Sequence, residues 1–511
     1  MAGFRELSTV DVIRAATAIY LQSSSHSSSN LSLLDHFCGG SAINISEEES
    51  KDVELVHLLI LCAEKIGSQQ FDRASTLLDH CENFSSKIGN SVERVVHYFV
   101  KALQERFNRE TGKITSKRVK GEEIQLLQPE ETILSLRPAL VACYKESSFY
   151  QATLFAGTQA IIERVASAKR IHLIDLAIRS GSHCIVLMQA LATRQECPVE
   201  LLKITAVGSS SKQRMEETGK RLAYFAETWN LPFSFKIVLV TETKDLNEDK
   251  FDLNAGEAVA VYSPILLSRT RHPDFLIKML RKISPCVMVV IEVEANHTSQ
   301  NFEDRFFEVL FHYSASFDCL KVSMARCDPE RVTFEEMYLG QHIRNIIATE
   351  GEERIFRHMK IDAWRKFFHR FGMVEAELST SSLFQAELVI KNFAFASYLT
   401  LDRNGQCLIV GWKGSPQLSL SVWKFHLFGR NTSTRPGMVS RYLMAEFCEP
   451  VCSVKAWCAG EQEQKYPARP RARHPRGQFS VRGIRLFRLE VERRGDPVDG
   501  SWQDMLPSPR I

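Results

Sequence analysis

The sequence predicts an α/β protein in which helices cover both faces of a mostly parallel sheet, and an all-helical block precedes that sheet. Two observations lead to this prediction. Short apolar runs alternate with helical stretches between residues 171 and 293, and amphipathic helical periodicity fills residues 52–107. Strands that alternate with helices are typical of parallel βαβ units, and strands buried on both faces are continuously apolar.

The expected strands of the parallel sheet are apolar runs of five to eight residues, at 171–175, 201–207, 235–240, 258–262 and 286–293. The helices expected between them are at 185–194, 212–229 and 274–283. Further helices are predicted at 302–313, at 361–371, and from a capping box of Thr333 and Glu336 to about residue 349. Three extended segments, at 387–395, 407–412 and 418–425, are predicted to add antiparallel edge strands, with a turn at 402–405.

The chain divides into three parts by composition and periodicity. Residues 1–51 are an N-terminal extension and linker, with a short amphipathic helix at 4–21 and a Ser-rich, then acidic, stretch after it. Residues 52–425 are the folded body, made of a helical cap over 52–125 and an α/β core over 126–425 that opens with a helix at 150–165. The cap helices are expected at 52–66, 71–81 and 92–107. Residues 426–511 are expected to be a disordered basic tail.

The charge of the chain is unevenly distributed. Residues 426–511 carry 15 Lys+Arg against 9 Asp+Glu, whereas residues 1–425 carry 49 against 52. Proteins that hold duplex DNA usually present a basic stripe, so the slightly acidic body argues mildly against direct DNA binding. The longest apolar runs are too short to span a bilayer, so no membrane partner is expected. The 13 Cys include no C-x-x-C pair and are expected to be free thiols.

The run Ile171-His172-Leu173-Ile174-Asp175 is the expected first strand of the sheet and ends in a carboxylate. Loops after such strands are where α/β proteins bind ligands. A dinucleotide loop needs several glycines, but Gly181 is the single glycine between Asp175 and His183. No acid follows strand 201–207 to hold a ribose. We therefore expect no catalytic residue, cofactor or metal, with Asp175 anchoring its loop and His172 in the core. The alternative is a small-molecule-binding or methyltransferase-like protein that uses the crevice after Asp175.

Two further patterns each allow two interpretations. Leu55, Leu58 and Leu59 match L-x-x-L-L, a helical docking pattern of coregulators, and equally fit the packed face of a cap helix. Trp412 and Trp423 flank a Gly/Pro turn, where they either pack the last strands or form an exposed aromatic pair for a partner. An Arg-rich segment at 469–476 fits a nuclear localisation signal or a solvated tail.

Five motifs in order resemble those of the plant GRAS family of transcriptional regulators. Residues 56–64 are similar to its first leucine-rich region, and the run from Ile171 to Asp175 to its V-H-I-I-D motif. Residues 221–233 are similar to the second leucine-rich region. Residues 302–318, which include Arg305, are similar to the P-F-Y-R-E region, and Trp364, Trp412 and Trp423 to the closing S-A-W region.

The resemblance covers residues 52–425. It implies a Rossmann-like, methyltransferase-like core under a helical cap and a nuclear location. It also implies regulation through DNA-binding transcription factors and other GRAS proteins. Homo- or heterodimers are possible under this resemblance, and direct DNA binding is left open. The opening looks closest to the DELLA branch of gibberellin signalling, although the D-E-L-L-A and V-H-Y-N-P motifs are missing from residues 1–51. Leu176-Ala177-Ile178 replaces the family's Phe-Asp-Ile, and Ser182-His183-Cys184 replaces its Gln-Trp pair.

Overall fold

The computed structural model describes residues 7–23, 46–113, 148–208, 212–240, 243–324 and 328–426. All of them belong to one compact unit, residues 1–459. The predicted basic tail, its Arg-rich segment and the Ser-rich linker lie outside the described residues. None of the described helices is both long enough and apolar enough to cross a membrane.

The described residues form one nine-stranded sheet in the order β3-β2-β1-β4-β5-β9-β8-β7, with β6 paired to β9. The parallel part consists of β1 (Arg170–Asp175), β2 (Leu201–Gly208), β3 (Phe233–Leu239), β4 (Ala258–Pro264) and β5 (Val287–Val293). The antiparallel part consists of β6 (Met373–Ala376), β7 (Leu399–Asn404), β8 (Cys407–Trp412) and β9 (Ser415–Phe425). The strand order reverses between β1 and β4, which makes that point the switch point of the sheet. The predicted mostly parallel sheet is confirmed.

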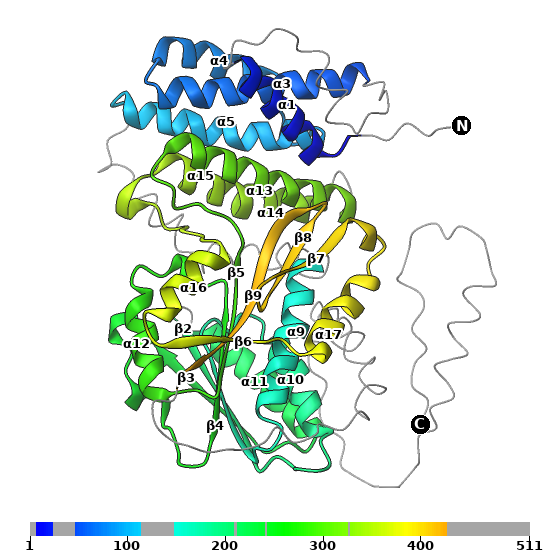
Figure 1. Cartoon of the computed structure of the whole chain (residues 1–511), viewed down its shortest axis with the longest axis vertical. Helices are drawn as coiled ribbons and strands as arrows, with labels where there is room; N and C mark the ends of the chain where they lie inside the picture. The colour runs from blue at the N-terminus through cyan, green and yellow to red at the C-terminus, as the bar shows by residue number, and fades with distance from the viewer. Residues whose placement is uncertain are drawn as a thin grey trace, which may run out of the picture. The chain divides into compact units, whose positions relative to one another are not determined.

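Two apolar cores cover the two faces of the sheet. One face packs against α9 (Ser148–Arg164), α10 (Ser182–Ala192), α11 (Lys212–Thr228) and α17 (Thr380–Lys391). The other face packs against α12 (Pro273–Ile283) and α16 (Ile361–His369). Helix α9 approaches β5 so closely that a Cβ on Gly157 would lie 2.9 Å from Val289, so this contact requires glycine. Figure 1 shows these helices on either side of the strands.

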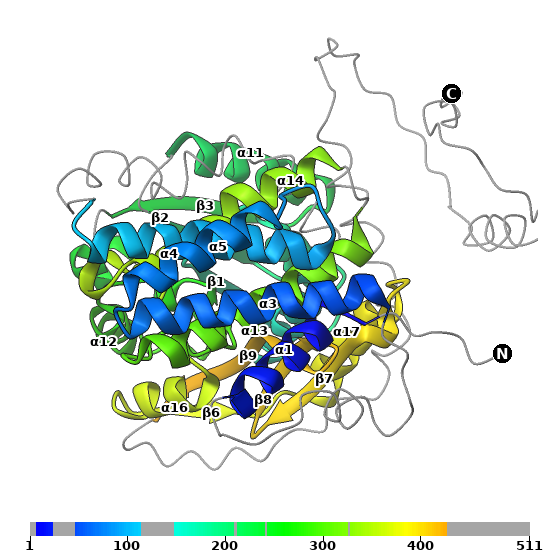
Figure 2. The same cartoon turned by 90° about the horizontal axis from the view of Figure 1, so that it is seen from above.

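A third apolar core holds the helical cap. It joins α1 (Thr9–Ser23), α3 (Glu47–Gly67), α4 (Phe71–Asn83) and α5 (Ser91–Glu110) to α13 (Phe302–Ser323) and α15 (Gly340–Ala348). Figures 1 and 2 show the first four helices lying over α13 and α15. Ser46 and Glu49 form a capping box that begins α3, and Asn301 caps α13 through the backbone N–H of Asp304.

One buried carboxylate ties the cap to the sheet. The Oδ1 atom of Asp318 on α13 accepts from the backbone N–H and the hydroxyl of Thr9, at 3.1 and 3.0 Å. Its Oδ2 atom accepts from the indole of Trp412 at 2.6 Å and lies 2.7 Å from Nζ of Lys413. These hydrogen bonds and the Lys413 ammonium hold the pKa of Asp318 below its usual value despite burial. Helix α1 is therefore bound to α13 and β8.

Three local predictions were wrong. Residues 387–395 are not a strand, because residues 387–391 belong to α17, whose buried Ala386, Val389 and Ile390 follow helical spacing. The capping box at Thr333 does not form, because Asp328 caps α14 (Pro329–Phe334) one turn earlier and a π-helical turn (Glu335–Leu339) follows. The turn expected at 402–405 lies at 405–406, where Gly405 has φ +59° between β7 and β8.

Candidate functional site

The crevice after β1 is occupied by side chains of the protein itself. Asp175 is fully buried, its Oδ1 atom accepts from the backbone N–H of Ala177 at 3.0 Å, and its Oδ2 atom lies 2.6 Å from Nε2 of His183. The His183 ring stacks on Tyr262 of β4, with ring centroids 4.2 Å apart. Asp175 therefore joins the loop to the first turn of α10.

Cys184 completes a buried cluster with Asp175 and His183. Its Sγ atom lies 3.3 Å from Nε2 of His183 and 3.9 Å from Oδ2 of Asp175. One ligand-type atom from each residue lies within 4.8 Å of the other two, so these three could hold a metal ion. Burial and the Asp175 carboxylate raise the pKa of the Cys184 thiol well above its usual value, so in the absence of a cation the thiol is protonated and a poor nucleophile.

The loop between β1 and α10 binds to its neighbours through its own backbone. Arg179 and Gly181 both have positive φ, +46° and +71°, and a Cβ on Gly181 would lie 3.0 Å from Thr218 of α11. The Thr218 hydroxyl donates to the carbonyl of Arg179. The glycine is needed for the turn and for the approach of α11. Residues 209–211, where an acid for a ribose would follow β2, lie outside the described residues.

His172 lies in the middle of β1 with no exposed surface. Its Nε2 atom is 2.8 Å from the Thr205 hydroxyl of β2, and its Nδ1 atom is 3.5 Å from Oε2 of Glu257. Burial lowers the pKa of His172 to about 4, so the ring is neutral at pH 7. These contacts place His172 in the core, away from any surface where it would act as a base.

The remaining motif residues are also buried. Arg305 donates to the carbonyls of Ile346 and Ser299, which joins α13 to α15, and pairs with Glu350. Trp364 packs on Phe368 within α16, and Trp423 of β9 lies 4.5 Å from the same Phe368 ring. Trp412 and Trp423 have no exposed surface, so the alternative of an exposed aromatic pair is wrong.

The L-x-x-L-L residues face the cap. Leu55 and Leu59 are buried in the cap core, and Leu58 is partly buried against it. The structure therefore gives all three a packing role, and docking through this helix stays a prediction.

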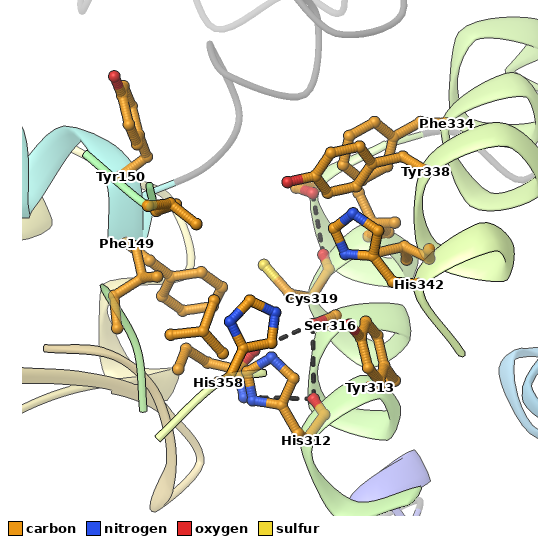
Figure 3. Close-up of a pocket in the computed structure, with 17 residues that line it drawn as sticks. Phe149, Tyr150, His312, Tyr313, Ser316, Cys319, Phe334, Tyr338, His342 and His358 are labelled. Carbon is orange, nitrogen blue, oxygen red and sulfur yellow. Dashed lines mark hydrogen bonds between the residues drawn. The ribbon is translucent and has the colours of Figure 1, made fainter. Parts of the chain in front are cut away.

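A second site was not predicted from the sequence. It is a cavity of about 150 Å³ at the carboxyl ends of β4 and β5, between the sheet, the start of α9, and helices α13 to α15. Figure 3 shows Phe149 and Tyr150 on one side of it and Phe334, Tyr338 and His342 on the other, with His312 and His358 between them. These residues come from segments far apart in the sequence, so no local motif marks the cavity, and only the fold brings them together.

The order of the parallel strands, the antiparallel extension and the helical cap together define a Rossmann-like α/β protein in which Ala177 and His183 engage the carboxylate after β1. The chain belongs to the GRAS domain family, a family of plant regulatory proteins, whose profile matches residues 55–424.

The similar proteins agree with this placement. DELLA protein RGL1 of Arabidopsis thaliana is 30% identical over 390 residues, which are 75% of this chain and 72% of that protein. DELLA protein 1 of Medicago truncatula is 29% identical over 399 residues, 74% of this chain and 64% of that protein, so the match spans under two thirds of the second relative. The crystal structure of SCL7 from Oryza sativa matches with a TM-score of 0.61 at 25% identity, over 72% of this chain and 99% of that one.

Proposed function

We propose that this protein is a nuclear regulator of transcription that acts through contacts with DNA-binding transcription factors and other GRAS proteins, and not as an enzyme. The observation that carries the proposal is the state of the crevice after β1. Both carboxylate oxygens of Asp175 are engaged, by Ala177 and by His183. A nucleotide cofactor in this fold needs an open loop at that point. The DELLA relatives support a place in gibberellin signalling.

The cap offers surface for such partners. Phe84 and Ile88, on the turn between α4 and α5, have exposed fractions of 61% and 67%. An apolar pair at that exposure is a suitable contact for another protein. The buried faces of Leu55 and Leu59, by contrast, are reached by a partner only if the cap unfolds.

A tethered reporter assay tests the proposal. The full chain, fused to a heterologous DNA-binding domain, is expected to change the output of a reporter promoter relative to that domain alone. Leu58→Asp is expected to abolish the change, because it places a charge against the cap core. Glu54→Ala, one turn earlier on the exposed face of α3, is the matched control and should leave the output unchanged.

Circular dichroism melts of the two variants separate loss of the cap from loss of a docking face. An unchanged melt with lost output supports docking through Leu58, and a lowered melt supports packing. No effect of the native chain on the reporter would argue against the proposal.

The alternative, an enzyme or small-molecule-binding protein that uses the crevice after Asp175, is tested by calorimetry. The native chain titrated with S-adenosylmethionine and with nicotinamide nucleotides is expected to give no heat of binding. Heat that is lost in Asp175→Asn would favour the alternative.

A further inference from the structure

The cavity at the ends of β4 and β5 differs from ordinary packing in three independent ways. The first is backbone strain. Ile265 directly follows β4 and lines the cavity with φ +49°. A β-branched residue is rarely found in this region, and such strain persists only where the surroundings hold it. Here the backbone N–H of Ile265 donates to Ile291 at 2.7 Å, and the next two N–H groups donate to the carboxyl group of Glu292.

The second feature is the π-helical turn, Glu335–Leu339, which carries Tyr338 and Leu339 into the cavity wall. Such turns cost helical hydrogen bonding and occur frequently at functional sites. This one is held from the cap side, because the buried guanidinium of Arg94 on α5 pairs with Glu335 at 3.0 Å. The irregular helix is thus fixed where it borders the cavity.

The third feature is a pair of buried imidazole nitrogens without a partner in the described structure, Nδ1 of His312 and Nε2 of His358. Both rings line the cavity, and burial lowers their pKa values to about 4 and about 3, so both are neutral at pH 7. A buried polar atom with no partner costs about 1–3 kcal/mol, which favours a partner for each nitrogen. Neither nitrogen is itself exposed to the cavity, so a molecule bound there reaches one only after a small shift of its ring.

The hydrogen bond made by the second nitrogen of each ring determines whether the nitrogen without a partner is a donor or an acceptor. His312 donates to the carbonyl of Pro416, which places its proton on Nε2 and leaves Nδ1 as an acceptor. His358 Nδ1 lies 3.0 Å from the Ser268 hydroxyl. Ser268 also lies near the carboxyl group of Glu292, whose pKa burial raises to about 7. The Ser268 hydroxyl can donate to or accept from Nδ1 of His358, so Nε2 of His358 is a donor in one tautomer and an acceptor in the other.

We propose that this cavity is a binding site for a small, uncharged, largely apolar molecule that carries an O–H or N–H donor. A cavity of about 150 Å³ matches the size that holds benzene in a well-studied engineered protein core. The walls contributed by Phe149, Tyr313 and Phe334 suit a flat ring, and the Nδ1 acceptor of His312 suits its donor group. No described side chain in the lining carries a full charge at pH 7, so an anion would bind without an ion pair to the cavity wall.

The test uses 4-fluorophenol, 4-fluorotoluene and 4-fluorobenzoate as probes of the full-length protein at pH 8, with fluorine NMR titration as the readout. The phenol is expected to bind about fivefold more tightly than the toluene, which corresponds to one net hydrogen bond. The benzoate is expected not to bind. Failure of both uncharged probes to bind would overturn the proposal, and so would equal binding of all three.

Two variants locate the binding. Cys319→Met adds atoms inside the cavity and is expected to weaken both uncharged probes at least tenfold, whereas Cys62→Met, at a buried thiol of the cap core, should not. If Cys319→Met does not fold, Ser323→Leu, one turn along α13, fills the same space. Unchanged binding in the filled cavity would overturn the site. A preference for phenol over toluene that persists in both His358→Leu and His312→Leu would overturn the donor requirement.

Discussion

Two regions at the carboxyl edge of the sheet, the loop after β1 and the cavity after β4 and β5, differ in how their carboxylate and imidazole side chains are hydrogen-bonded. After β1, Asp175, His183 and Cys184 contact one another, and both carboxylate oxygens of Asp175 are engaged. After β4 and β5, His312 and His358 border a cavity and each keeps one nitrogen without a partner in the described structure. The carboxylate at the fold's usual cofactor position is thus engaged within the protein, and the imidazole nitrogens without a partner lie at the ends of β4 and β5, beside α13 and α15.

The two regions differ because their side chains come from different numbers of chain segments. His183 and Cys184 lie in the first turn of the helix that follows Asp175, so a short segment supplies the whole cluster. The cavity is bordered by the sheet on one side and by α13 and α15 on the other, and α15 continues from a helix interrupted by a π-turn. Packing across two layers leaves a gap that no single segment fills.

The largest effect is expected at the closed crevice. Asp175→Ala removes the acceptor of His183 and of the Ala177 N–H and leaves two buried donors without partners. The free energy of unfolding should fall by about 3 kcal/mol. Guanidinium unfolding followed by circular dichroism measures this, with Asp175→Asn as the isosteric control that keeps one acceptor oxygen. A loss below about 1 kcal/mol would mean that the crevice is solvated and open, which would remove the contrast with the cavity.

The second effect concerns pH. The folded pKa of His358 is about 3 because of burial and the nearby His312 and Arg269, whereas an unfolded histidine titrates near 6.5. Below pH 6.5 this histidine is protonated in the unfolded chain but stays neutral in the folded chain. The free energy of unfolding therefore falls as the pH drops. The slope from this one group approaches about 1.4 kcal/mol per pH unit. Unfolding measured from pH 7.5 to 5 should therefore depend less steeply on pH in His358→Leu than in the native chain, and equal slopes would show that His358 is protonated in the fold.

The parallel strands could be predicted because each is a short apolar run between helical stretches, as 201–207 is, and the cap helices because each is long and periodic, as 92–107 is. The segment 387–395 was misread because its run Leu388-Val389-Ile390 is rich in strand-favouring side chains, while the helical spacing that decides its structure begins earlier, at Ala386. At the candidate sites, Asp175 as a loop anchor was readable from one strand and one loop. The cavity was not, because His312, His342 and His358 lie 30 and 16 residues apart and meet only after the layers pack.

The smallest effect is expected at His358, which is compared with His183 in a matched pair of substitutions at pH 7.5. His183→Leu takes the hydrogen-bond donor from a buried carboxylate and should cost about 2–3 kcal/mol of unfolding free energy. His358→Leu removes an imidazole nitrogen that lacked a partner together with one hydrogen bond to the Ser268 hydroxyl, and because the gain and the loss offset each other the net cost should stay under about 1 kcal/mol. Guanidinium unfolding of both variants measures the two losses of unfolding free energy for comparison. If His358→Leu lowers the unfolding free energy as much as His183→Leu does, Nε2 of His358 already has a hydrogen-bond partner. The contrast between the cavity and the crevice after β1 would then be lost.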